Sequence, residues 1–157
     1  MTVELKPRGT RGADVPRIPG PLLAMMTGLM VGAFRLLGDR WKMLGQPLLL
    51  LTTVGTRSGK SRRTLVCRFS EADDSWLVVA SAAGSARNPA WYLNLAKNPD
   101  QVWIEIAGRT VPVRAETLKG PERANAWADI VARAPGYAAY QEKTDREIPV
   151  VRLRPAS

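Results

Sequence analysis

The sequence predicts a mainly β domain of the α+β class, in which an antiparallel barrel carries added helices. Two observations favour this class over a parallel α/β sheet: there are about six strand-like segments against few helices, and most of the strands pair across short turns as hairpins. The 157 residues fit one domain, and 45% hydrophobic with 24% charged residues is an ordinary globular balance.

The first 45 residues precede the predicted barrel and divide into two parts. Residues 1–20 are rich in Gly, Pro and Arg and lack periodicity, which predicts a flexible basic tail. Residues 21–45 begin with an uncharged run, 21–34, that is shorter than the about 20 residues a membrane span needs. Apolar residues such as Leu22, Met26 and Leu29 recur at helical spacing, so we expect an amphipathic helix over 21–37 and a connection to residue 45.

This helix has three interpretations on sequence alone. It packs on the barrel, or it lies on an anionic membrane, since Arg17, Arg35, Arg40 and Lys42 flank it. A secretory signal is the weakest of the three, because a Pro-rich leader of some 20 residues would come before the apolar stretch.

From residue 46 the pattern changes to that of strands, so 46–157 is the predicted barrel domain. Residues 48–54 are a continuous apolar run that ends at Gly55, and 62–69 alternate, with Leu65, Cys67 and Phe69 on one side. The Gly- and Ser-rich segment between them is a turn. Together they predict a β-hairpin with a basic tip.

The later elements follow from similar signals. Asn88 is expected as the N-cap of a helix with Pro89 at its first position, and Pro112 predicts an edge or a bulge in its strand. We expect strands at 76–82, 101–107, 109–116 and 148–154, and helices at 89–97, 121–133 and 135–141.

The charge of the chain points to an anionic ligand. The net charge is +9 and the pI about 10.4, which attracts nucleic acid, anionic lipid or phosphorylated small molecules. Five cations and no acid fall within 57–68: Arg57, Lys60, Arg62, Arg63 and Arg68. The segment 54–61, VGTRSGKS, is not a P-loop, because Val54 stands where the first Gly is required and a strand pattern follows it. What remains is a turn able to surround an anion, or an exposed tip charged for solubility.

Several mechanisms are excluded by composition. The chain has no histidine, so a Ser-His-Asp or Cys-His constellation and the common catalytic zinc sites drop out. The single cysteine, Cys67, forms no intramolecular disulfide, which suits a reducing compartment such as the cytoplasm. Without a histidine to activate it, Cys67 is interpreted as a buried thiol rather than a nucleophile.

Two further segments offer chemistry. Small residues, Ser81 to Gly84, let a flat ring approach the backbone, and Trp91 and Tyr92 beyond them are either aromatic surface or plain core. Tyr137 and Tyr140 share a helix face, so they are either hydrogen-bond donors to a substrate carbonyl or part of a helix–barrel seam.

We expect Asp145 and Arg146 to form a structural ion pair or cap rather than a catalytic acid–base pair.

Three segments in order, LLLLTTVGTRSGKSRRT, VVASAAGSARNPAWYLNLAKNP and PGYAAYQEKTDREIPVVRL, resemble the deazaflavin (coenzyme F-420)-dependent nitroreductases. The resemblance covers roughly residues 40–155 and implies a split β-barrel like that of FMN-binding proteins. It implies catalytic roles for Tyr137, Ser81 and Tyr140, and no metal. The residues it places at the cofactor are Thr56, Arg57, Ser58, Arg62, Arg63, Thr64, Leu65, Val66, Cys67, Val79, Ala80, Ser81, Ala82, Ala90, Trp91, Tyr92, Leu93, Asn94 and Tyr137.

The same resemblance implies hydride transfer from reduced F-420 to a hydrophobic quinone, enone or nitro-aromatic acceptor. The cofactor supplies the difficult chemistry, which explains how a chain without histidine is an enzyme. The chain departs from the family at Ala82 and Ala134, where bulkier or more polar residues are usual, so the acceptor pocket is expected to be wider or less polar. We expect a cytoplasmic monomer or weak homodimer, peripheral at the inner face of the membrane if the helix docks there.

Three alternatives stay open. The same fold binds FMN instead, or the protein is a non-catalytic deazaflavin carrier. A basic nucleic-acid binder is the third, but the sequence has no recognised nucleic-acid motif.

Overall fold

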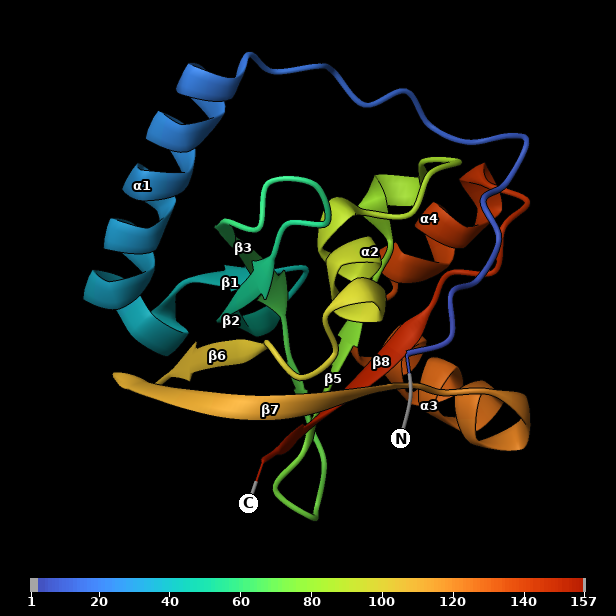
Figure 1. Ribbon diagram of the computed structural model, residues 1–157. Coiled ribbons are helices and arrows are strands. Elements are labelled where there is room, and N and C mark those ends of the chain that lie inside the picture. Colours follow the sequence, from blue (N-terminus) through green and yellow to red (C-terminus); the bar gives the residue numbers. More distant parts are fainter. Residues whose placement is uncertain (1–2, 157) are drawn as a thin grey trace.

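The computed structural model describes residues 3–156 as a curled antiparallel sheet with helices around it (Figure 1). The helices are α1 (Gly20–Leu37), α2 (Ala90–Lys97), α3 (Gly120–Arg133) and α4 (Gly136–Lys143), with short 3-10 turns η1 (Gly38–Arg40) and η2 (Ala82–Gly84). The strands are β1 (Lys42–Met43), β2 (Gln46–Val54), β3 (Ser61–Cys67), β4 (Phe69–Ser70), β5 (Trp76–Val79), β6 (Trp103–Ile106), β7 (Arg109–Thr117) and β8 (Val150–Pro155).

The strand order is β1-β2-β6-β7-β8-β5-β4, with β3 paired to β2, and every pair is antiparallel. This confirms the predicted antiparallel class. The described residues form eight strands rather than about six, because β1 and β4 are two-residue strands too short to show a pattern. The predicted hairpin is β2–β3, in register from Leu48 opposite Cys67 to Val54 opposite Ser61.

The continuous leucine run of β2 is explained by burial on both faces. Leu48 and Leu50 pack into one hydrophobic cluster, and Leu49 and Leu51 into another. A strand covered on both sides loses the apolar–polar alternation of a half-exposed strand, so 48–51 is apolar at every position. The strand is therefore the wall shared by two cores.

Each core belongs to different helices. The first, which we call the α4-side core, joins Phe34 of α1, Ile130 of α3 and Tyr137 of α4 to the sheet. The second, the α2-side core, contains Trp91 and Tyr92. The two faces of the β2–β3 hairpin thus meet different helices.

Helix α1 stands at one side of the molecule and is buried at only two positions, Val31 and Phe34 (Figure 1). Its exposed large hydrophobic residues are Leu22, Leu23, Met25, Met26, Leu29, Met30, Leu36 and Leu37. The stretch Gly20–Arg40 is long and apolar enough to cross a membrane by length and composition alone, with 11% of its apolar window buried. It exceeds the 21–34 run because Arg35 alone interrupts the apolar sequence before Gly38.

Residues 3–13, part of the segment expected as a flexible tail, follow the surface of the barrel, whereas residues 14–19 are exposed and lead across to α1 (Figure 1). The Gly9 amide donates to the Ala86 carbonyl (2.8 Å) and the Ala13 amide to the Gly84 carbonyl (2.9 Å). A Cβ at Gly12 would lie 2.1 Å from the Ala86 nitrogen, so only glycine allows this approach. Backbone pairing of this kind leaves no apolar periodicity to detect; residues 1 and 2 lie outside the described range.

Two local expectations differ from the structure, and a third is confirmed. Asn88 does not cap α2: Pro89 is the N-cap, and the Asn88 side chain instead donates to the Lys6 carbonyl at 2.8 Å. The strand predicted over 76–82 ends at Val79, where the chain turns into η2. Pro112 faces Trp103 of β6 in β7, and the pairing of β7 with β8 begins only at Val113, so Pro112 lies at an edge as expected.

Candidate functional site

The tip of the β2–β3 hairpin is a concentration of unpaired cations. A backbone bond from Gly55 to the Lys60 carbonyl (2.8 Å) closes the turn. Arg57, Lys60, Arg62 and Arg63 are exposed, and none of the ion pairs among residues 3–156 includes them. We call these four residues the tip cations. They leave this end of the hairpin with an unmatched positive potential for an anion.

Arg68 does not belong to this group, which corrects the expected five-cation cluster. Its side chain is buried and pairs with Asp39 at 2.9 Å, and it also donates to the Leu48 carbonyl. The alternation that put Arg68 on one side with Arg62 did not reveal that η1 brings an acid to cover it.

Helix α2 holds the tip in place. The Asn94 side chain is 6% exposed; its oxygen accepts from the Thr56 amide (3.3 Å) and its NH2 donates to Thr53 (3.0 Å). Asn98 donates to the Val54 carbonyl at 3.2 Å. These bonds fix the start of the turn on the body of the domain, so the tip cations project from a supported base.

The predicted small-residue segment forms a left-handed turn after β5. Ala82, Ala83 and Gly84 have φ of 44°, 53° and 83°, and each alanine pays roughly 1–2 kcal/mol for this conformation. Ser81 and Ala82 are half-buried, whereas Val79 and Ala80 are buried. The turn presents small side chains and backbone at the end of the strand, as a flat ring would require.

Arg146 forms hydrogen bonds to the backbone of that turn. Its guanidinium donates to the carbonyls of Ser81 (2.6 Å), Ser85 (2.7 Å) and Ala80 (3.1 Å). The expected pair with Asp145 is wrong: Asp145 instead accepts from Thr10 and from the Arg11 amide, and these bonds lower its pKa to about 2. The bonding of Arg146 to this turn could not be predicted from the sequence, because hydrogen bonds to backbone carbonyls leave no pattern of residue types along the chain.

Tyr137 and Tyr140 lie together on α4, as predicted. The Tyr137 ring is 4% exposed and stands edge-on to Phe69 and to Tyr140, with 5.9 Å between ring centres in each pair. Burial, and then the neighbouring Cys67, raise the pKa of the Tyr137 hydroxyl. Tyr137 is therefore a neutral phenol that can donate a hydrogen bond and does not act as a base.

Cys67 is a buried thiol, as expected. Its sulfur donates to the Met43 carbonyl at 3.2 Å, and burial raises its pKa above the ordinary value. A thiol that stays protonated is a poor nucleophile.

The other residues assigned to the cofactor by resemblance divide by exposure. Tyr92 is fully buried and its hydroxyl donates to the Glu4 carbonyl (2.6 Å). Trp91 is 9% exposed and packs in the α2-side core. The residues that retain surface are Thr56, Arg57, Ser58, Arg62, Arg63, Thr64, Leu65, Val66, Ser81, Ala82, Ala90 and Leu93.

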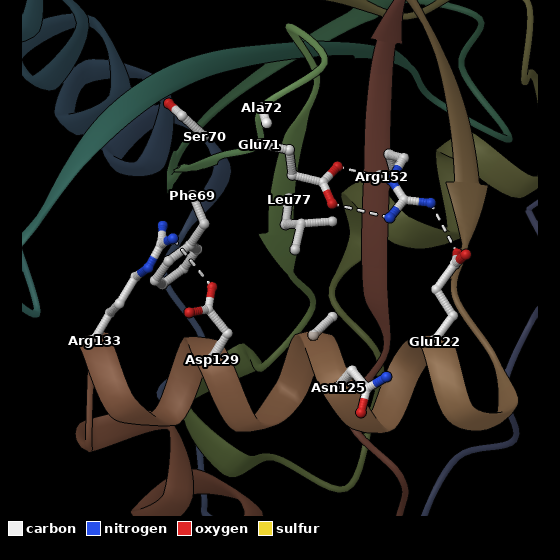
Figure 2. Close-up of a pocket in the computed structure, with 11 residues that line it drawn as sticks. Phe69, Ser70, Glu71, Ala72, Leu77, Glu122, Asn125, Asp129, Arg133 and Arg152 are labelled. Carbon is white, nitrogen blue, oxygen red and sulfur yellow. Dashed lines mark hydrogen bonds and ion pairs between the residues drawn. The ribbon is translucent and has the colours of Figure 1, made fainter.

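Two cavities lie outside this set. Figure 2 shows one of about 400 Å³ between α3 and β4–β5, where Arg152 joins Glu71 (2.7 Å) and Glu122 (2.8 Å). The other, of about 540 Å³, lies between residues 8–17 and 85–87. Neither contains a predicted site residue, although Phe69 in the first contacts Tyr137. Among residues 3–156, no group of three potential ligands is placed to hold a metal.

Known proteins resemble the chain over most of its length. The profile of a family described as F-420H(2)-dependent quinone reductase matches residues 30–155. Rv1261c of Mycobacterium tuberculosis, an F-420H(2)-dependent quinone reductase, is 37% identical over 68% of this chain and 72% of its own length. Rv3178 of the same organism, which carries the same family name, is 39% identical over 69% of this chain and 90% of its own.

Two solved structures agree. An F-420-H2-dependent reductase, FDR-A, superposes with a TM-score of 0.62 at 37% identity, covering 73% of this chain and 99% of that one. A domain-swapped dimer superposes with a TM-score of 0.63 at 33% identity, covering 86% of this chain and all of that one. The first of these likenesses confirms the split-barrel architecture.

Proposed function

Because the chain belongs to the F-420H(2)-dependent quinone reductase family, we propose that it transfers a hydride from reduced coenzyme F-420 to a quinone. The observation that carries the proposal is the group of tip cations, which form no ion pair within residues 3–156. They lie at one end of the β2–β3 hairpin, and Cys67 at the other end of β3 lies beside Tyr137. Membership in this family disfavours two alternatives that the sequence left open, FMN binding and a non-catalytic deazaflavin carrier.

The residues present fit this cofactor. Its acidic tail calls for unpaired cations, which Arg57, Lys60, Arg62 and Arg63 supply, with Thr56 and Ser58 as polar neighbours. Its flat ring calls for a wall of small residues, which Ser81 and Ala82 supply at the end of β5. We propose that these two features hold opposite ends of one cofactor, with half-buried Thr64, Leu65 and Val66 of β3 between them.

The chain's own residues then bind, orient and exclude water. When bound, the cofactor supplies a hydride, so the protein needs no acid–base triad. We propose that the Tyr137 and Tyr140 hydroxyls donate hydrogen bonds to the acceptor carbonyl and that Ser81 supports the ring. Because burial raises the pKa of Tyr137, we propose that the proton that completes quinone reduction comes from solvent rather than from that tyrosine.

A titration with two cofactors tests the identity of the ligand. The fluorescence of F-420 should be quenched on mixing with the full-length protein, and FMN should bind at least tenfold more weakly. Tight FMN binding without F-420 binding would remove the proposal and restore the flavin alternative.

We further propose that α1 docks this cytoplasmic protein on an anionic membrane, where a quinone is dissolved. Its exposed apolar face, flanked by Arg17 and Arg40, has the composition of an interfacial helix, whereas Arg35 pairs with Glu105 of β6 at 3.0 Å. Removing residues 1–40 is a poor test, because residues 9 and 13 hydrogen bond to the barrel and Phe34 is in the core.

A cleaner test replaces three fully external residues, Met25, Leu29 and Leu36, which are 57%, 69% and 86% exposed, by Gln. Sedimentation with anionic vesicles should be lost, while F-420 affinity and the melting temperature stay unchanged. Wild-type levels of vesicle binding in the triple variant would exclude docking through this face.

The acceptor and the assembly are also proposals. We compare the rates at which menadione, an unsaturated lactone and a nitro-aromatic compound are reduced at equal concentration. Menadione, the quinone, should be reduced fastest, and faster reduction of the nitro-aromatic compound would contradict a quinone acceptor.

Light scattering should show a monomer or a weak homodimer, whereas a stable dimer would favour a domain exchange like that of the domain-swapped relative.

A further inference from the structure

Arg146 is a buried cation without an acid. Its side chain is 3% exposed, and none of the ion pairs formed within residues 3–156 includes it. The two comparable arginines are matched: Arg68 pairs with Asp39, and Arg152 pairs with Glu71 and Glu122. Taking an unpaired charge out of water is costly, so a guanidinium compensated only by carbonyl dipoles needs an explanation.

Its contacts all converge on one place in the fold. Three carbonyls, those of Ala80, Ser81 and Ser85, bracket the left-handed turn, and the Asn88 side chain accepts a further bond at 3.1 Å. The planar fork of arginine suits this spread of acceptors, and lysine cannot reproduce it. The charge and the strained turn are therefore a single unit.

We propose that Arg146 is a positioning residue of the ring site: it fixes the Ser81–Gly84 turn and leaves an uncompensated positive charge behind the wall that receives the ring. The inference rests on the proposed function, which puts the ring at this turn.

The charge has a direction of effect that follows from simple chemistry. A hydride carries one negative charge, so at equal protonation the ring that holds it has one more negative charge than the ring without it. A cation behind the wall therefore stabilises the reduced ring more than the oxidised ring. Low exposure of Arg146 keeps solvent from screening this difference.

The test compares two substitutions by titrating each protein with oxidised and with reduced F-420. Arg146→Gln removes the charge and should raise the Kd of the reduced form at least tenfold more than that of the oxidised form. For a two-electron couple, this tenfold difference lowers the potential of the bound cofactor by about 30 mV. Arg146→Lys keeps the charge but loses the fork, so both Kd values should rise together and their ratio should stay within twofold of wild type.

Arg123→Gln is the matched control, because Arg123 also donates to a backbone carbonyl, that of Ile148, but on α3 and beside Glu147. It should leave the ratio unchanged. If Arg146→Gln weakens the binding of oxidised and reduced F-420 equally, or if either Arg146 variant binds both forms like wild type, the inference is overturned while the proposed function stands. If Arg146→Gln does not fold, Arg146→Lys still decides whether the fork matters. Absence of F-420 binding by the wild-type protein overturns both.

Discussion

Removing two tip cations, with Arg57→Ala and Arg62→Ala in one protein, should weaken F-420 binding about tenfold. Both side chains are exposed, so each charge contributes in the range of roughly 0.2–1 kcal/mol that surface ion pairs show. Two such losses against one polyanionic tail approach 1.4 kcal/mol, which corresponds to about tenfold in Kd. The fold should survive, because the side-chain hydrogen bonding of this pair within residues 3–156 is limited to one long bond, 3.5 Å, from Arg62 to Ser58.

The assay is quenching of F-420 fluorescence at low and high salt. The difference in F-420 affinity between wild type and the double variant should narrow at about 0.5 M salt, where the attraction between charges extends only a few ångströms. Arg109→Ala with Arg114→Ala is the matched control: it removes the same charge from exposed positions of β7 that make no ion pair within the described range. Equal losses of F-420 affinity in the two double variants, or no loss in either, would contradict a specific role for the tip cations.

Three further predictions concern single residues. Tyr137→Phe should lower kcat about three- to tenfold, because one hydrogen bond is lost. The wild-type rate should not fall with rising pH below pH 10, because burial raises the pKa of the Tyr137 hydroxyl. An alkaline fall in rate that is present in the wild type and absent in the variant would contradict this protonated state. Cys67 should react with iodoacetamide at least tenfold more slowly in the native than in the unfolded chain, since burial raises its pKa; equal rates would show an accessible thiolate. Glu71→Gln should lower the free energy of unfolding at pH 7 by about 1–3 kcal/mol in urea titrations, because Arg152 loses the nearest of its charged partners and keeps Glu122 and Glu116. Since Arg152 lowers the pKa of Glu71, that contribution is complete above the unfolded pKa and disappears as the pH falls through the folded one, so an undiminished gap at acid pH would count against it.

The strand and helix pattern of the chain was open to prediction because burial leaves a period. The hairpin partners Leu65 and Cys67 face the α4-side core, while Val66 faces the other, as their alternation indicated. The leucine run of β2 reads as buried for the same reason. Elements of two residues, β1 and β4, leave no period and were not predicted.

Contacts made through backbone groups could not be predicted from the sequence. Residues 3–13 looked like a free tail because their bonds run from amide to carbonyl and rely on Gly9 and Gly12. Arg146 looked like half of an ion pair because Asp145 is its neighbour, although the two side chains point to different partners.

The candidate site was predicted unevenly for the same reason. The tip cations were visible as charges without acids, but only the fold shows that Asp39 neutralises Arg68. The aromatic residues Trp91 and Tyr92 were assigned to the cofactor by resemblance; both are buried in the α2-side core, and their place at the cofactor stays a prediction.

Quinone-dependent oxidation of reduced F-420 tests the central claim most directly. With catalytic amounts of the full-length protein and menadione, absorbance should report many turnovers per protein, and the Arg57→Ala, Arg62→Ala protein should need a higher cofactor concentration to reach a similar limiting rate. Stoichiometric binding of reduced F-420 with no oxidation above the protein-free rate would contradict the account and leave a carrier in place of an enzyme.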